Sequence, residues 1–325
     1  MTQSDLRDAL EGRQVWIYFT AVIIAGIAGL LVPGSTTLEP AINPALALML
    51  FVTFLQVPVA ALGQALRDVR FLGALLAVNF VVVPLLVAAL IQVLPASPML
   101  RLGVLMVLLC PCIDYVVTFS HLGRADARLL LASTPALLIV QMVLLPVYLR
   151  LFLGAQAAAY VQLGPFVHAF VWLIAIPFVL AALVQAWAAK SKTGEKSANV
   201  LGLLPVPATA AVLFIVVAAV TPQLGLAVEA TLKVVPLYVA FAVIAPLLGW
   251  GVARVARLDA SAGRAIAFSA ATRNSLVVLP LALAVPGAVP LLPAVIVAQT
   301  LVELIAELIY IRLMPKLGAT AAPTT

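Results

Sequence analysis

The chain has 325 residues, of which 65% are hydrophobic and only 9% are charged, and its mean hydropathy is +1.22. Because a soluble domain carries about 25% charged residues, this composition argues against a soluble enzyme, a disordered protein and a nucleic-acid-binding protein. The formal net charge is +6, and the two cysteines, Cys110 and Cys112, lie two residues apart in an apolar stretch, which does not suggest a disulfide framework.

A transmembrane helix needs about 20 predominantly apolar residues, and the sequence contains a series of such runs. In chain order, the ten runs are roughly 15–31, 42–62, 71–94, 102–122, 129–152, 165–189, 200–220, 232–255, 264–285 and 289–312. Because the runs are long and continuously apolar, they do not fit a β-barrel, whose strands are short and alternating. The sequence therefore predicts an all-α integral membrane protein with ten transmembrane helices.

Basic residues are distributed unequally between the two sides of this arrangement. Of the 18 Lys and Arg residues, 14 lie on the side that holds the N-terminus, three lie on the other side, and Arg273 lies inside a span. Since cytoplasmic loops carry an excess of Lys and Arg, we predict a multi-pass protein of the cell's inner (cytoplasmic) membrane with both termini in the cytoplasm. The net charge then reflects topology and requires no nucleic-acid partner.

The most polar interior stretch, KSKTGEKSAN at 190–199, divides the chain into two parts. The sixth span, 165–189, belongs structurally to the second part, so each part is a repeat of five helices. An odd number of spans gives the two repeats inverted orientations, an arrangement common in secondary transporters. The predicted segments are a cytoplasmic N-terminal segment (1–14), a first repeat (15–189), a cytoplasmic linker (190–199), a second repeat (200–313) and a cytoplasmic tail (314–325).

Two spans in corresponding positions of the repeats, the fourth and the ninth, carry unusual residues. The fourth contains CPCID at 110–114, and the ninth contains TRNS at 272–275 with Pro280 soon after. A proline frees backbone polar groups, which a membrane helix tolerates only beside protein or a water-filled cavity. We therefore expect both spans to be broken.

Ionisable residues inside membrane spans are costly and mark functional sites by default. Here they are Asp114, Arg273, Glu303 and Glu307. We expect Asp114 and Arg273, in the two broken spans, to approach each other, because each charge would offset the desolvation of the other. The pair is either a substrate or proton site or a structural ion pair between the repeats.

Three further side chains are candidates for the site. The thiol of Cys112 is either a soft ligand for a metalloid or a small apolar filler. Glu303 lies deeper in the last span than Glu307, on the same helix face. Glu303 either couples transport to protons or is hydrogen-bonded to a neighbouring helix. Asn274 is either a solute contact or a link between helices.

The sequence contains no Walker loop and no GxGxxG, HExxH or CxxC motif. We therefore expect neither an enzyme nor a cofactor nor a bound metal. The expected partners are a small inorganic or organic solute and the lipid bilayer, and the sequence leaves homo-oligomerisation open.

The segment 109–126 (LCPC, VVTFS and GRAD) resembles the fourth span of the arsenite-efflux permeases of the bile acid:sodium symporter superfamily. The segment 300–303 (TLVE) is similar to that family's last-span motif, and 268–275 (FSAATRNS) is similar to its Asn-containing break. The resemblance implies ten spans in two inverted five-helix repeats, a panel and a core subdomain, and crossing broken helices 4 and 9. It also implies that Cys112 carries the thiol associated with arsenite transport and that Glu303 is the functional glutamate.

The sequence departs from this family at Asp114, Tyr115 and Arg273. The sodium-coupled bile acid branch is similar too, but it uses polar, acidic and amide groups for sodium where Asp114, Tyr115, Ser269 and Arg273 stand here. Because a guanidinium is positively charged at all relevant pH values, it disfavours a neighbouring sodium ion. This favours proton coupling or uncoupled efflux over sodium symport.

The leading hypothesis is a secondary transporter that exports arsenite or a related trivalent metalloid by proton antiport. Its solute-binding residues would be Cys112, Asp114, Arg273 and Asn274, with Glu303 in proton coupling. The alternative is a bile-acid-like organic-anion carrier in which Arg273 binds the anionic group. A receptor or scaffold that transports nothing is a third interpretation, and the four buried charges argue against it.

Overall fold

A computed structural model describes residues 3–56, 68–113, 115–154, 164, 167, 168, 171–283, 285–288 and 291–318. Within these ranges the chain is helical, and the extended pairing found there is an isolated bridge. Eight helices are long and apolar enough to cross a membrane: Asp5–Leu31, Ser35–Gln56, Val69–Val93, Ala127–Leu153, Val171–Ala188, Pro205–Pro222, Ala227–Val255 and Leu291–Lys316. The prediction of an all-helical, multi-pass membrane protein is confirmed.

These eight helices overlap eight of the ten predicted spans. Each of the other two predicted spans, 102–122 and 264–285, contains two short helices separated by a non-helical segment. Breaks in these two spans are what their prolines and polar residues predict. The ten-span topology with inverted repeats stays a prediction.

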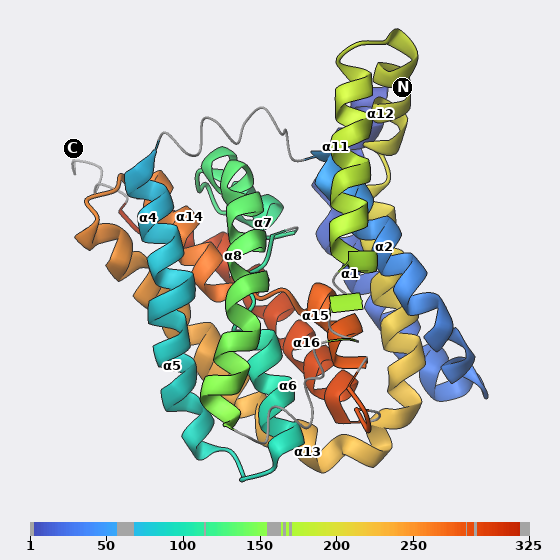
Figure 1. Ribbon diagram of the computed structural model, residues 1–325, viewed down its shortest axis with the longest axis vertical. Coiled ribbons are helices and arrows are strands. Elements are labelled where there is room, and N and C mark those ends of the chain that lie inside the picture. The colour runs from blue at the N-terminus through green and yellow to red at the C-terminus, as the bar shows by residue number, and fades with distance from the viewer. Residues whose placement is uncertain are drawn as a thin grey trace, which may run out of the picture. The chain divides into compact units, whose positions relative to one another are not determined.

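The chain forms two compact units, and each takes segments from both predicted repeats. The first unit draws its described residues from Met1–Val59, Ala158–Thr231 and Leu276–Val297. Its helices are α1 (Gln3–Leu31), α2 (Glu39–Gln56), α11 (Ile176–Ala188), α12 (Lys192–Leu201), the first part of α13 (Pro205–Val255) and most of α15 (Ser275–Leu283). In this unit α2 packs against α11 and α12 (Figure 1).

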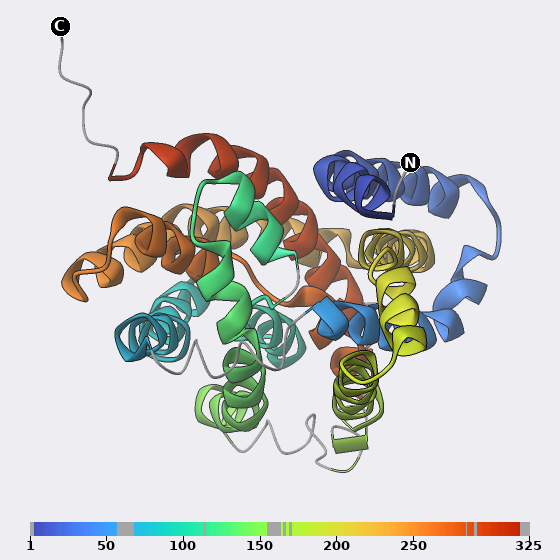
Figure 2. The ribbon, with the colours of Figure 1, turned by 90° about the horizontal axis from the view of Figure 1, so that it is seen from above.

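The second unit draws its described residues from Ala60–Ala157, Leu232–Ser275 and Ala298–Thr325. Its helices are α4 (Val69–Ala77), a π-helical turn (Val78–Val82), α5 (Val83–Leu90), α6 (Pro98–Leu108), α7 (Val116–Leu122), α8 (Ala127–Leu153), α14 (Ala260–Ala271), the second part of α13 and most of α16 (Leu291–Leu313). The short helix α7 packs against both α8 and α14, and α14 also contacts α4 and α8 (Figure 2).

Two predicted links are helical in the structure. The predicted linker 190–199 lies mostly in α12, whose Glu195 is in the first turn, where a negative charge interacts favourably with the helix dipole. The link between the seventh and eighth predicted spans lies inside α13. Pro222 and Gly225 do not end α13, because the residues around them are mainly good helix formers such as Leu, Ala and Glu.

Aspartates begin three helices of the second unit. The Asp68 carboxylate accepts a hydrogen bond from the backbone N–H of Phe71, and the Asp126 carboxylate accepts one from Leu129, both at 3.0 Å. Asp259 does the same at the start of α14. Each carboxylate satisfies an N–H group that has no partner within its helix.

Prolines inside the helices leave carbonyl groups without their usual donors, and neighbouring tyrosines supply replacements. Pro84 cannot donate to the carbonyl of Phe80, which instead accepts a 2.5 Å hydrogen bond from the Tyr148 hydroxyl. Pro246 likewise frees the carbonyl of Ala242, which accepts a hydrogen bond from the Tyr310 hydroxyl. These bonds satisfy polar backbone groups that lipid could not.

Candidate solute site at two helix breaks

The two broken spans meet at their non-helical segments, both of which belong to the second unit. In the first break the described residues 109–113 and 115 lie between α6 and α7, and in the second break residues 272–274 separate α14 from α15. Pro111 and Arg273 pair as an isolated antiparallel bridge between the segments. The structure therefore places the unusual residues of the fourth and ninth predicted spans side by side.

Backbone hydrogen bonds join the two breaks. The N–H of Cys112 donates to the carbonyl of Thr272 at 3.1 Å, and the N–H of Asn274 donates to the carbonyl of Cys110 at 2.8 Å. Both cysteines are fully buried thiols. Because each break satisfies backbone groups of the other, neither exposes them to lipid.

The side chain of Arg273 is fully buried beside these breaks. Its Nη2 donates to the carbonyls of Ser269 and Ala270, the latter at 2.9 Å, and to the Asn79 Oδ1 at 2.9 Å. Its Nη1 makes a longer 3.4 Å contact with the carbonyl of Leu108. The guanidinium thus lies at the C-terminal ends of α6 and α14.

The carboxylate of Glu303, on α16, contacts both breaks. Its Oε1 accepts a hydrogen bond from the Tyr115 hydroxyl, and its Oε2 accepts one from the backbone N–H of Arg273 at 2.6 Å. Gln299, one turn earlier on α16, donates to the same Oε2 at 2.6 Å. Glu303 is therefore bonded to the last residue of the first break and to the centre of the second.

A second carboxylate of α16 reaches the ninth span from the next turn. The hydroxyl of Thr272 donates to the Oε1 of Glu307 at 2.5 Å, and Glu307 is fully buried. Glu303 and Glu307 are four residues apart and share a helix face, as predicted. The two carboxylates contact adjacent residues of the second break.

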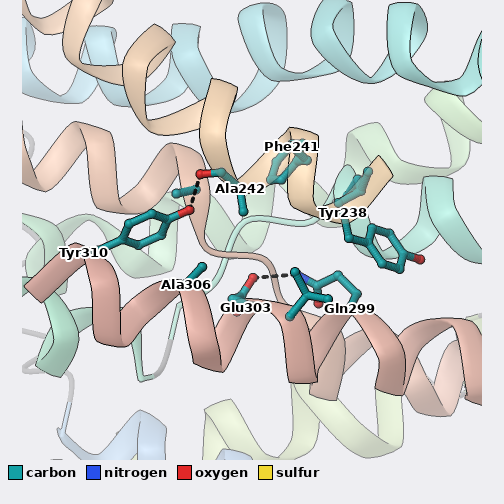
Figure 3. A pocket seen from close by; sticks show the side chains of 10 residues that line it. Tyr238, Phe241, Ala242, Gln299, Glu303, Ala306 and Tyr310 are labelled. Carbon is teal, nitrogen blue, oxygen red and sulfur yellow. Dashed lines mark hydrogen bonds between the residues drawn. The ribbon is translucent and has the colours of Figure 1, made fainter. Parts of the chain in front are cut away.

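A small cavity adjoins Glu303 between α16 and the second part of α13. Figure 3 shows Gln299, Glu303 and Tyr310 of α16 opposite Tyr238 and Phe241 of α13. The cavity volume is about 10 Å³, which is enough for about one water molecule. The Oε1 of Gln299 is buried and has no hydrogen-bond partner among the described residues. There is therefore room beside the Glu303 carboxylate for a water molecule, which can donate a proton and exchange it.

The structure brings four of the five predicted site residues together at or beside the breaks: Cys112, Arg273, Asn274 and Glu303. The fifth, Asp114, lies outside the described residues, so its expected pairing with Arg273 stays a prediction. The roles of all five as solute-binding or proton-coupling residues are proposals.

Several partners of these side chains were not predicted as site residues. Asn79 is a lone amide in an apolar run, and Ser269 stands at a position where the sequence departs from the sodium-coupled branch. The contact of Gln299 with Glu303 could have been predicted from the sequence, since Gln299 precedes Glu303 by one helical turn. Tyr115 and Thr272 lie in the two unusual segments, but their contacts with Glu303 and Glu307 depend on how distant helices pack.

Comparison with known protein families matches residues 43–230 to the Sodium Bile acid symporter family. The matched region is more than half of the chain; it includes Cys112 and ends before Arg273 and Glu303. No curated protein matches the chain. The extent of the family match and the apolar helices point to the same conclusion: the chain belongs to the Sodium Bile acid symporter family, whose members are membrane transporters.

Proposed function

We propose that the protein is a secondary transporter that exports arsenite or a related trivalent metalloid in exchange for protons, with its solute site at the two helix breaks. Family membership supports transport of a small solute across the bilayer. The observation that carries the metalloid assignment is the position of Cys112: its buried thiol belongs to the first break, and its backbone N–H is bonded to the second.

Thiol chemistry suits this class of solute. Thiolates are soft ligands that select soft metal and metalloid centres over hard cations. Asn274 lies on the second break, opposite Cys110, and we assign its amide to a hydroxyl group of the solute. The backbone bonds between the breaks keep Cys112 and Asn274 on neighbouring segments of the same crossing.

Glu303 supports the exchange for protons through its contacts. Its two oxygens accept hydrogen bonds from a side chain of the first break, from the backbone of the second break and from Gln299. Adding a proton to one carboxylate oxygen converts that oxygen into a donor, so the hydrogen bond that it accepts from its break must change. Proton binding at Glu303 would therefore alter the solute site directly.

An organic-anion carrier is the alternative, in which Arg273 binds the anionic group. The Nε of Arg273 is buried without a partner among the described residues and would suit an anion. Against this, the guanidinium is fully buried and its Nη2 already donates to three oxygens. An anion would have to displace those bonds, so the contacts favour the metalloid assignment.

Flux into everted membrane vesicles tests the proposal. Arsenite, antimonite and an organic anion such as a bile salt would be supplied under separate proton and sodium gradients. An acidic lumen should drive arsenite inward, because protons leave as the solute enters. Cys112→Ser should lower this flux by about tenfold or more, in line with the loss of a metal-site contact. The matched variant Cys110→Ser should keep most of it.

Two results would overturn the proposal. The first is arsenite flux that is unchanged in Cys112→Ser at equal protein levels. The second is sodium-driven flux of the organic anion that is lost in Arg273→Ala and indifferent to Cys112→Ser, which would establish the alternative.

A further inference from the structure

The surroundings of the Arg273 guanidinium are uncharged oxygen atoms. They are backbone carbonyls of Ser269, Ala270 and Leu108 and the amide oxygen of Asn79. Glu303 is a buried carboxylate bonded to this residue, but it accepts its hydrogen bond from the backbone N–H of Arg273. Among the described residues, the hydrogen-bond acceptors of the guanidinium itself are thus carbonyl and amide oxygens and no carboxylate.

The carbonyls come from the last turn of one helix and the last residue of another. Ser269 and Ala270 lie near the end of α14, and Leu108 ends α6. The final carbonyls of a helix have no intrahelical donor and carry the negative end of its dipole. Broken helices in transporters use such carbonyl groups to coordinate a monovalent cation.

Two further contacts complete the surroundings of the guanidinium. Asn79 is oriented because its Nδ2 donates to the Leu75 carbonyl at 3.0 Å and to the Ser269 hydroxyl at 2.9 Å. This turns its Oδ1 toward Arg273. The ring of Phe241 lies with its centroid 5.5 Å from the guanidinium carbon, at a distance that allows a cation–π interaction. Both contacts favour a positive charge at this position.

We propose that the guanidinium of Arg273 is a tethered cation, which occupies a monovalent-cation site formed by the ends of α6 and α14 and by Asn79. The charge that other carriers take from solution is then part of the chain. The protein requires no bound sodium, and removing the side chain should leave a site that a free monovalent cation can fill. This inference deepens the proposed function but does not depend on the identity of the solute.

Cation rescue of Arg273→Ala tests the proposal on the purified full-length protein in lipid nanodiscs. The melting temperature would be measured in choline, sodium and guanidinium chlorides at equal, non-denaturing ionic strength. The wild-type protein should melt at one temperature in all three salts. Arg273→Ala should melt several degrees lower in choline and recover most of the difference in guanidinium or sodium, because a ligand that binds the folded state stabilises it.

Three further variants make the result specific. Arg264→Ala is the matched control, since Arg264 also donates to carbonyls, those of Arg124 and Leu317, but near the surface. Its melting temperature should not respond to the choice of cation. Arg273→Lys retains a tethered charge and should need no cation. Adding Asn79→Ala to Arg273→Ala should abolish the rescue.

Other outcomes would overturn the tethered-cation proposal. The first is a wild-type protein that melts at a higher temperature in sodium than in choline. The second is an Arg273→Ala protein whose melting temperature is the same in all three salts. The third is an equal rise in melting temperature for Arg264→Ala. If Arg273→Ala yields no folded protein, Arg273→Gln takes its place and is extracted from the membrane in a buffer that contains sodium chloride. Failure of Arg273→Gln to fold in that buffer also overturns the proposal. Loss of arsenite flux in the transport assay leaves this thermal readout untouched, so the two proposals fail separately.

Discussion

Glu303 and Arg273 are ionisable side chains buried at the helix breaks, and both are held by hydrogen bonds. Glu303 is 3% exposed and accepts bonds from a hydroxyl, an amide and a backbone N–H, whereas Arg273 is 0% exposed and donates to carbonyl and amide oxygens. A charge buried without such partners would be strongly destabilising. The hydrogen bonds therefore explain how both residues can lie inside the membrane.

Glu303→Gln should uncouple solute movement from the proton gradient. Glutamine has a similar shape and can still accept hydrogen bonds, but it cannot bind and release a proton. In everted vesicles with an acidic lumen, arsenite accumulation should fall to the level of vesicles without the protein. Exchange of labelled for unlabelled arsenite across the same membrane should persist, since that exchange requires no net proton movement.

The matched control for this change is Glu195→Gln, at an exposed carboxylate of α12. It should leave both accumulation and exchange at wild-type rates. Gradient-driven accumulation that survives in Glu303→Gln would show that the proton travels elsewhere.

Sequence alone could identify these buried charges but not their partners. Arg273 and Glu303 stood out because charged residues are rare in apolar spans. Their hydrogen bonds to Asn79 and Tyr115 join residues far apart in the chain, and no periodicity encodes such contacts. The contact between Gln299 and Glu303 was predictable, because residues four apart share a helix face.

At the level of whole helices, α13 and α14 approach each other closely at Gly249. A Cβ atom at this position would lie 2.8 Å from the Cβ of Ala270, 2.9 Å from the Cα of Ala267 and 3.0 Å from the carbonyl oxygen of Ile266. Small residues allow membrane helices to pack at such short range. This contact supports the end of α14 that supplies carbonyls to Arg273.

Gly249→Ala should therefore destabilise the protein, although alanine favours helix over glycine by about 1 kcal/mol. Overpacking a close contact costs about 1–3 kcal/mol, and the atoms that the new methyl meets belong to backbone and Cβ positions that cannot turn away. Gly251→Ala, two residues along α13, is the matched control because a Cβ atom at that position would meet no atom within 4 Å. Reversible unfolding in bicelles should show a lower free energy of unfolding for Gly249→Ala and a slightly higher one for Gly251→Ala. Equal changes in the two variants would contradict a close helix approach at Gly249.

The location of the breaks was predictable, whereas the way the helices compensate for their prolines was not. Pro111 and the polar residues after it identify the fourth span as broken, and the TRNS segment identifies the ninth. The tyrosines that donate to proline-freed carbonyls, Tyr148 and Tyr310, are ordinary aromatic residues in apolar sequence. Their role depends on tertiary packing, which a hydropathy pattern does not contain.

For the whole molecule, the exposed apolar surface and the distribution of basic residues determine how the chain lies in a membrane. Large apolar side chains such as Leu30, Leu85 and Leu151 are exposed on the long helices, as expected for surfaces that contact lipid chains. Which side of the membrane each loop faces depends on the distribution of Lys and Arg, because basic loops are retained in the cytoplasm. The predicted orientation therefore needs a measurement made in a membrane.

Labelling of single cysteines can determine this orientation, since the chain has only two cysteines and both are buried. In a background with Cys110→Ser and Cys112→Ser, a membrane-impermeant maleimide should label Ala96→Cys and Pro286→Cys in intact cells. It should label Lys196→Cys and Lys316→Cys only in everted vesicles, because an odd number of predicted spans separates each consecutive pair of these four sites. All four original residues are exposed, so access should depend on the side of the membrane. The reverse pattern would invert the topology, and labelling of positions 96 and 196 from the same side would contradict three spans between them.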